Sequence, residues 1–214
     1  MNVGDITAKW ANLDPGRPAL VDIPTGRRVS FSELESSVRQ AANGFLGLGL
    51  RKGDRVAILA KNSIEYFETY YACARAGLIA QPLNWRLGVP ELARILEDGE
   101  PGAFLTSSDF ANEREALSGL VEIDHWLQYG PDSDESFERM KAGAPDSSPA
   151  NGAGDDDPVL ILYTGGTTGL SKGALHSHRT LYMGMLNQTV AERIVPSDVY
   201  MLTGQMFHIP VALA

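Results

Sequence analysis

The chain has 214 residues, which is enough for one domain or for part of a larger one. Its net charge is −9, and Lys and Arg form no basic stripe, which argues against a nucleic-acid partner. Cys73 is the only cysteine, so disulfides within the chain and cysteine-based zinc sites are excluded. The sequence shows neither a signal peptide nor an apolar run long enough to cross a membrane, so we expect a cytoplasmic protein.

The first 128 residues alternate between predicted strands and predicted helices, which is typical of a mostly parallel sheet flanked by helices. Strands are expected at 19–23, 28–31, 56–60, 78–80, 103–106 and 121–127. One helix is expected to end near residue 49, and others to cover 64–76, 90–97 and 112–117. Pro24, Thr25 and Gly26 separate the first two strands and predict a hairpin.

Capping signals mark the ends of two of these helices. Ser30 and Glu33 have the spacing of a capping box, and Asn62 and Glu65 repeat that spacing before the next helix. Gly77 is expected to end this second helix, because glycine readily adopts the left-handed conformation found at helix ends.

Residues 129–157 are rich in Pro, Gly, Ser and Asp, and they show little apolar periodicity. We expect a long surface connection with one helical turn near 136–141. The run Asp155-Asp156-Asp157 could be mistaken for a metal site, but a solvated turn before the next strand is the preferred interpretation.

The apolar run at 159–163 predicts a short buried strand, and a loop of small residues follows it. The loop contains Thr164, Gly165, Gly166, Thr167, Thr168 and Gly169, and it is closed by Lys172. Glycines let the backbone turn sharply and present successive N–H groups, while hydroxyls and a lysine add further groups that bind anions. The pattern therefore predicts a polyphosphate-binding loop, followed by an extended segment at 174–178 and a helix at 180–193.

Two common phosphate loops do not fit this run. Gly173 stands where a Walker A loop has its Mg²⁺-binding hydroxyl, and no Gly-x-Gly-x-x-Gly opens a helix here. The run instead resembles the signature loop of the adenylate-forming superfamily, which includes acyl-CoA synthetases, luciferases and peptide-synthetase adenylation domains. The usual form is Tyr-Thr-Ser-Gly-Thr-Thr-Gly-x-Pro-Lys-Gly, from which Gly165 and Ser171 depart while remaining small.

The resemblance continues along the chain. Weaker matches to acyl-CoA synthetases occur in order at 18–21, 31–34, 50–58, 82–87 and 205–208. The resemblance implies that residues 1–214 form the first part of the large N-terminal AMP-binding domain. Within it we expect an α/β subdomain at 1–128, the connection at 129–157, and the phosphate-loop strand, loop and helix at 158–214.

The resemblance also implies the roles of individual residues. The groups expected to bind the phosphates of ATP are Thr164, Gly165, Gly166, Thr167, Thr168, Gly169 and Lys172. His208 is expected to donate a hydrogen bond to the carboxylate substrate, and together with Lys172 it is the expected catalytic residue. Mg²⁺ would accompany ATP, held largely by the phosphates, and coenzyme A would be the acceptor of the acyl group.

Other candidate residues have simpler interpretations. His176 and His178 would share one face of a strand, but without an apparent third metal ligand they are expected to be structural. Trp85 and Arg86 could line a pocket or pack a loop, and packing is favoured.

The parent protein is thus expected to be a ligase that joins a fatty or related carboxylic acid to coenzyme A. Its expected partners are the small molecules ATP, coenzyme A and the acid, and the sequence leaves its oligomeric state undetermined. The family's adenine-binding motif, ribose-binding aspartate and C-terminal lid have no counterpart before Ala214, which predicts an inactive N-terminal fragment. An acyl-AMP ligase, a peptide-synthetase adenylation domain and a non-catalytic truncated homologue are the alternatives.

Overall fold

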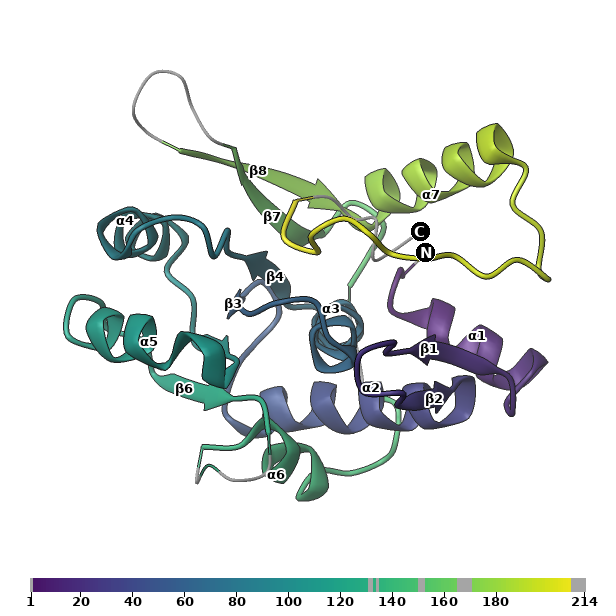
Figure 1. Cartoon of the computed structure of the whole chain (residues 1–214), viewed down its shortest axis with the longest axis horizontal. Helices are drawn as coiled ribbons and strands as arrows, with labels where there is room; N and C mark the ends of the chain where they lie inside the picture. The colour runs from purple at the N-terminus through teal and green to yellow at the C-terminus, as the bar shows by residue number, and fades with distance from the viewer. Residues whose placement is uncertain (1, 131–132, 134, 150–152, 165–170, 209–214) are drawn as a thin grey trace.

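The computed structural model describes residues 2–130, 133, 135–149, 153–164 and 171–208 (Figure 1). It is an α/β fold with a mostly parallel sheet, as the sequence predicts. The strands are β1 (Pro18–Val21), β2 (Arg28–Ser30), β3 (Arg55–Leu59), β4 (Ile79–Pro82), β5 (Ala103–Thr106), β6 (His125–Gln128), β7 (Pro158–Thr164) and β8 (Lys172–Ser177). The predicted hairpin is the antiparallel pair β1–β2, and the other six strands form one sheet in the order β6-β5-β3-β4-β7-β8.

Strands β3 to β7 all run in one direction, and only β8 is antiparallel to its neighbour. The helices are α1 (Asp5–Leu13), α2 (Phe31–Gly47), α3 (Ile64–Ala76), α4 (Val89–Gly99), α5 (Ala111–Ser118), α6 (Phe137–Ala142) and α7 (His178–Glu192), and a short 3₁₀ helix, η1 (Ser108–Phe110), precedes α5. No helix in the described part of the chain combines the length and the apolar character that a membrane crossing needs.

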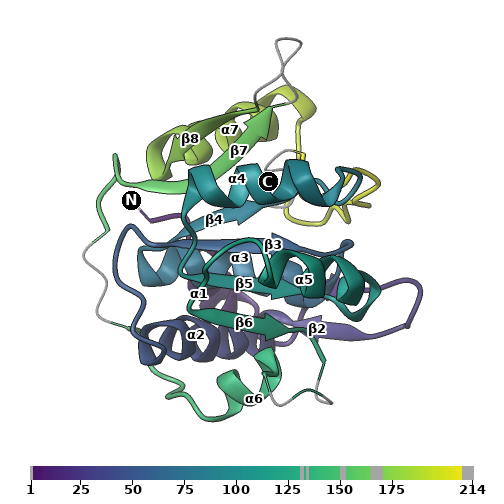
Figure 2. The ribbon, with the colours of Figure 1, turned by 90° about the vertical axis from the view of Figure 1, so that its left-hand side faces the viewer.

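Two helical layers cover the two faces of the sheet. In β3, Val56 and Ile58 belong to the core shared with α2 and α3, whereas Ala57 and Leu59 belong to the core shared with α4 and α5. Successive residues of a strand point to opposite faces, so a strand covered on both sides is apolar throughout. Figures 1 and 2 show the strands between these two pairs of helices.

Local sequence signals set several of the helix ends. The capping box of α2 is present, since Ser30 Oγ accepts from the Glu33 backbone N–H and Glu33 Oε2 accepts from the Ser30 backbone N–H. Gly77 ends α3 in the left-handed conformation with φ 74°. The interpretation of Asn62 as the cap of α3 is wrong: Ser63 Oγ accepts the Tyr66 N–H, while the Asn62 side chain binds residues far along the chain.

The remaining differences from the predicted elements have local reasons. Helix α1 was not predicted, since its Ncap position, Gly4, offers no capping side chain. Strand β6 begins four residues later than expected, because Val121 N–H still bonds to Leu117 O at the end of α5. The connection at 129–157 is not confined to the surface, because Phe137 is buried against Phe45. The other predicted strands and helices are found within a few residues of their expected bounds.

A buried ion pair joins the three helices nearest the N-terminus. The guanidinium of Arg75 in α3 meets the carboxylate of Glu35 in α2 through two N···O contacts of 2.9 and 3.0 Å. Thr7 of α1 donates to the same carboxylate at 2.6 Å, and Arg75 also donates to the Gly4 carbonyl. A buried ion pair is tolerated only when further hydrogen bonds satisfy both ions, and this cluster supplies them.

His178 provides a second buried polar link to the N-terminal segment. It is the first residue of α7 and is fully buried, and its Nδ1 accepts the backbone N–H of Val3 at 3.1 Å. Burial lowers the pKa of His178, an effect that the nearby Asp157, Asp5 and Asp155 oppose. The imidazole is therefore neutral in the folded protein, as an acceptor Nδ1 requires.

We expect the free energy of unfolding to fall as the pH drops below about 6.5, the ordinary pKa of histidine. The unfolded chain binds a proton there that the folded chain resists, so the contribution of His178 is present above that pH and is lost as the pH falls through the lower folded pKa. Urea unfolding at pH 7.5 and at pH 5.5 measures this difference in the free energy of unfolding. His178→Gln should flatten the dependence and His176→Gln should not; equal dependence in all three proteins would contradict the assignment.

Candidate functional site

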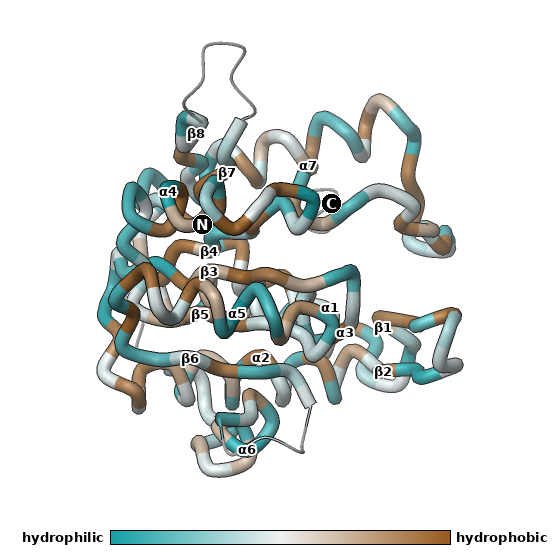
Figure 3. Tube along the Cα trace, turned by 60° about the vertical axis from the view of Figure 1, so that its left-hand side comes forward, coloured by the Kyte–Doolittle hydropathy of each residue, from teal (hydrophilic) through white to brown (hydrophobic). Residues whose placement is uncertain are grey.

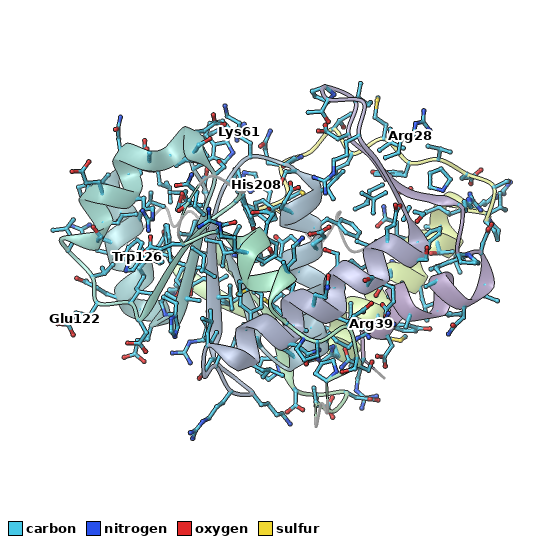
Figure 4. The ribbon with its side chains drawn as sticks, turned by 90° about the horizontal axis from the view of Figure 1, so that it is seen from below. Arg28, Arg39, Lys61, Glu122, Trp126 and His208 are labelled. Carbon is cyan, nitrogen blue, oxygen red and sulfur yellow. The ribbon has the colours of Figure 1, made fainter. Side chains whose placement is uncertain are left out.

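The parallel strands bring the candidate site residues to one edge of the sheet. Chain segments leave the carboxyl ends of β3, β4, β5, β6 and β7 at this edge, which is where ligands bind in open α/β sheets. Figure 4 shows His208 and Lys61, which follows β3, on one side of the molecule, and Glu122, which precedes β6, away from them. We call this side the carboxyl edge.

Thr164 and Lys172 form the mouth of the predicted phosphate loop. They are paired residues of the β7–β8 ladder, both are exposed, and Thr164 Oγ1 donates to Lys172 O at 3.4 Å. Among the described residues, Lys172 has no carboxylate partner, so its ammonium group is available to an anion. The loop residues Gly165, Gly166, Thr167, Thr168 and Gly169 lie outside the described residues.

Two contacts fix the strand that leads into the loop. Tyr163 donates a hydrogen bond to Asp98 Oδ2 of α4 at 2.6 Å, and burial together with this carboxylate raises the pKa of Tyr163 far above its ordinary value. The hydroxyl therefore remains a donor. In β8, a Cβ at Gly173 would lie 2.7 Å from Ile161 Cδ1, so a larger residue here would force the Ile161 side chain to move.

His208 follows a tightly held segment at the carboxyl edge. The Asn62 side chain accepts the Met206 N–H at 2.9 Å and donates to Gly204 O at 2.7 Å. Tyr70 of α3 donates to Met206 O at 2.7 Å. Met206 is buried and His208 is exposed, so the anchored turn presents the imidazole to solvent at this edge.

Trp85 and Arg86 pack against the same segment. Trp85 Nε1 donates to Gln205 Oε1 at 3.2 Å, and its ring meets Phe207 edge-on with centroids 6.2 Å apart. The Arg86 guanidinium lies 4.8 Å from the centre of the Trp85 ring. The favoured interpretation of the two residues as packing groups agrees with these contacts.

The two histidines of 176–178 do not share a strand face as expected. His176 belongs to β8, whereas His178 starts α7 and binds the Val3 amide. No group of three or more metal-ligating side chains occurs among the described residues. The acidic run forms ion pairs, with Asp156 on Arg179 at 2.8 Å and Asp157 on Lys52 at 2.7 Å.

A cavity of about 420 Å³ lies nearby, at the carboxyl ends of β3, β5 and β6. Its cations are already paired across its walls: Arg27 with Glu65, and Lys61 with Asp109 at 3.1 Å. Glu138 adds a third carboxylate to the lining. This charge balance makes the cavity a poor phosphate site compared with the loop mouth at Lys172.

Thr164 and Lys172 thus lie together at the carboxyl end of β7, whereas the segment before His208 is held by Asn62 after β3 and contacts Trp85 after β4. Sequence reasoning missed Asn62 and Tyr70 as the residues that hold the segment before His208. No local signal was available, because these contacts join residues 136 to 144 positions apart.

We expect Asn62→Ala to release the 204–206 turn, because the substitution removes both of the side chain's hydrogen bonds to this backbone. Amide exchange by NMR should show the Met206 N–H exchanging at least tenfold faster, which corresponds to about 1.4 kcal/mol. Asn43→Ala is the matched control, since Asn43 also makes two backbone hydrogen bonds, to Pro145 and Ser147, away from this edge. Unchanged Met206 exchange in Asn62→Ala would contradict the assigned anchor.

Comparisons with known proteins agree with this geometry. Residues 7–212 match the family described as AMP-binding enzyme. The chain is 30% identical over 212 residues to the long-chain-fatty-acid–CoA ligase FadD13 of Mycobacterium tuberculosis, covering 97% of this chain and 41% of that protein. It is 31% identical over 214 residues to an indoleacetate–CoA ligase of Aromatoleum aromaticum, covering 98% of this chain and 41% of that protein.

Solved structures of CoA synthetases and related enzymes also superpose on this chain. The N-terminal domain of FACL13 from M. tuberculosis superposes with a TM-score of 0.78 at 30% identity, over 85% of this chain and 45% of that one. ATP-bound MatB from Rhodopseudomonas palustris superposes with a TM-score of 0.83 at 32% identity, over 97% of this chain and 41% of that one. The chain therefore spans about two fifths of the length of the curated relatives named here.

Proposed function

This chain belongs to the AMP-binding enzyme family, and we propose that it is part of an ATP-dependent carboxylic acid–CoA ligase. The observation that carries the proposal is the mouth of the glycine-rich loop, where Lys172 lacks a carboxylate partner among the described residues at the carboxyl edge of the sheet. The relatives named above are CoA ligases, and one structural neighbour was solved with ATP bound.

The proposed reaction has two steps. A carboxylate oxygen of the acid attacks the α-phosphorus of ATP, and pyrophosphate leaves to give an acyl-adenylate. The thiol of coenzyme A then attacks the acyl carbon, which forms the thioester and releases AMP. Both ATP and the acid are anionic, and charge builds on the departing pyrophosphate, so the first step needs a cation and fixed N–H donors around the phosphates.

The residues of this chain would divide that work. Lys172 and Thr164, with Gly165, Gly166, Thr167, Thr168 and Gly169 of the loop, would bind the β and γ phosphates. His208 would donate a hydrogen bond to a carboxylate oxygen of the acid and orient it for attack. The exposed Lys172 and Thr164 fit an anionic ligand, and Mg²⁺ would be held largely by the phosphates rather than by side chains of this chain.

A fatty acid is the acid that we propose, supported by the 82–87 segment and by the likeness to FadD13. Relatives named for aromatic acids, including a feruloyl-CoA synthase of Amycolatopsis that is 33% identical over 187 residues, make an aryl acid the alternative substrate. An acyl-AMP ligase, a peptide-synthetase adenylation domain and a non-catalytic binding module remain alternatives to the CoA ligase.

On its own, the 214-residue chain is proposed to bind nucleotide weakly and not to catalyse the reaction. The chain spans about two fifths of the length of its relatives, so we expect further groups around the reacting phosphorus to come from the remainder of such an enzyme.

Calorimetric titration with ATP and Mg²⁺, and ATP–pyrophosphate exchange with a panel of carboxylic acids, test the proposal together. We expect weak ATP binding that Lys172→Ala lowers at least tenfold, since a charge-assisted hydrogen bond contributes about 1.5–3 kcal/mol. Lys9→Ala, far along the chain from the loop, is the control. Exchange should stay at background.

ATP affinity that Lys172→Ala leaves unchanged would contradict the assignment of the loop. Robust exchange by the isolated chain would contradict its proposed incompetence, and the acids that support exchange would then identify the substrate class. A stable chain without any measurable nucleotide affinity would favour the non-catalytic module.

A further inference from the structure

The strand that carries the loop mouth is joined to the rest of the sheet over a short stretch. Strand β7 pairs with β4 at Leu160, opposite Ala80, and residues 161–164 of β7 pair with β8 alone. Since β8 is the last strand of the sheet, these residues belong to a two-stranded ribbon, and Figure 1 shows it projecting from the sheet. A two-stranded ribbon is only marginally stable in water by itself, so its end needs support from elsewhere in the fold.

Tyr163 supplies this support. Its ring is half-buried and packs against the core shared with α4 and α5, and its hydroxyl donates to Asp98 Oδ2 of α4 at 2.6 Å. The ring also covers the opposite strand, since a Cβ at Gly173 would lie 3.2 Å from Tyr163 Cζ. Figures 2 and 3 show β7 beside α4. One side chain thus holds both strands of the ribbon to α4, one residue before Thr164 and one residue after Lys172.

The position of Asp98 in α4 is unfavourable for the helix itself. Asp98 lies in the last turn, where the backbone dipoles place partial negative charge, and this turn holds no basic residue. Glu97 and Glu100 add two more carboxylates at the same end of the helix. An acid at position 98 is therefore explained by its contact with Tyr163 and not by the stability of α4.

We propose that Asp98 is a positioning residue for the loop mouth: by accepting the hydrogen bond of Tyr163, it holds Thr164 and Lys172 in the arrangement that binds phosphate. The inference rests on the proposed function, because it takes ATP to be the ligand of the mouth. Groups that are ordered before binding cost the ligand less to engage, so an anchored mouth binds phosphate more tightly than a loose one. Asp98 acts through Tyr163, because its own charge would repel an anionic ligand.

The sign of the effect separates positioning from simple charge repulsion. If charge alone mattered, removal of a carboxylate near a phosphate site would strengthen ATP binding. Asp98→Ala should instead weaken ATP binding about three- to tenfold, the range that one net hydrogen bond contributes. Asp98→Asn keeps an acceptor oxygen for Tyr163 and should retain the original affinity or exceed it. Tyr163→Phe removes the donor and should weaken binding as much as Asp98→Ala does.

Calorimetric titration of the 214-residue chain with ATP and Mg²⁺ measures these affinities, and NMR order parameters of the Thr164 and Lys172 amides report on the mouth directly. We expect the order parameters to fall from about 0.85, typical of a rigid backbone, toward about 0.6 in Asp98→Ala and in Tyr163→Phe. The two substitutions combined should lose no more affinity than either alone, because both remove one hydrogen bond. Glu97→Ala is the matched control, since it removes an exposed carboxylate from the same turn of α4 and should not weaken binding.

Three outcomes would overturn the proposal: ATP binding that Asp98→Ala leaves equal or makes tighter, a loss in Asp98→Asn as large as in Asp98→Ala, or order parameters that Asp98→Ala leaves unchanged. Circular dichroism should show every variant folded, since Asp98→Ala relieves the charge at the end of α4. A chain that binds no ATP before any substitution would contradict the proposed function. In that chain, a mouth that Asp98→Ala loosens would still support the anchoring role of Asp98, and an unchanged mouth would contradict it.

Discussion

The common direction of five neighbouring strands is the constraint on which the rest of the structure depends. Because β3 to β7 are parallel, each must return to the amino edge through a crossover, and helices fill most of these crossovers on both faces. The same constraint sends every segment that follows one of these five strands to the carboxyl edge. Residues that are far apart in sequence, such as Asn62 and Met206, meet there.

This geometry explains why the site combines rigid and exposed parts. The central strands β3, β4 and β5 and helix α3 are almost entirely buried, and the Arg75–Glu35 pair joins α3 to α2. The groups proposed to bind substrate stand at the ends of these elements, where Lys172 and His208 are exposed. Anchoring by Asn62 and Tyr70 gives the His208 segment a fixed position without burying its imidazole.

Features set by neighbouring residues could be predicted from the sequence. The capping box at Ser30 and the left-handed Gly77 need only a few adjacent residues, and both are found where expected. The buried Arg75–Glu35 pair and the link between His178 and Val3 could not be predicted, since they join residues 40 and 175 positions apart. Asn62 shows the limit of a local rule, because its spacing to Glu65 suits a helix cap. Its side chain instead accepts the Met206 N–H, and Ser63 caps α3.

The most direct test of the central claim, that the carboxyl edge is the nucleotide-binding edge, is NMR mapping of the chain titrated with ATP and Mg²⁺. The account predicts that the amide signals of Thr164 and Lys172 shift with saturation, while those of Asp54 and Gly102, which precede β3 and β5 at the amino edge, stay in place. Shifts concentrated at Asp54 and Gly102, with Thr164 and Lys172 unmoved, would contradict it.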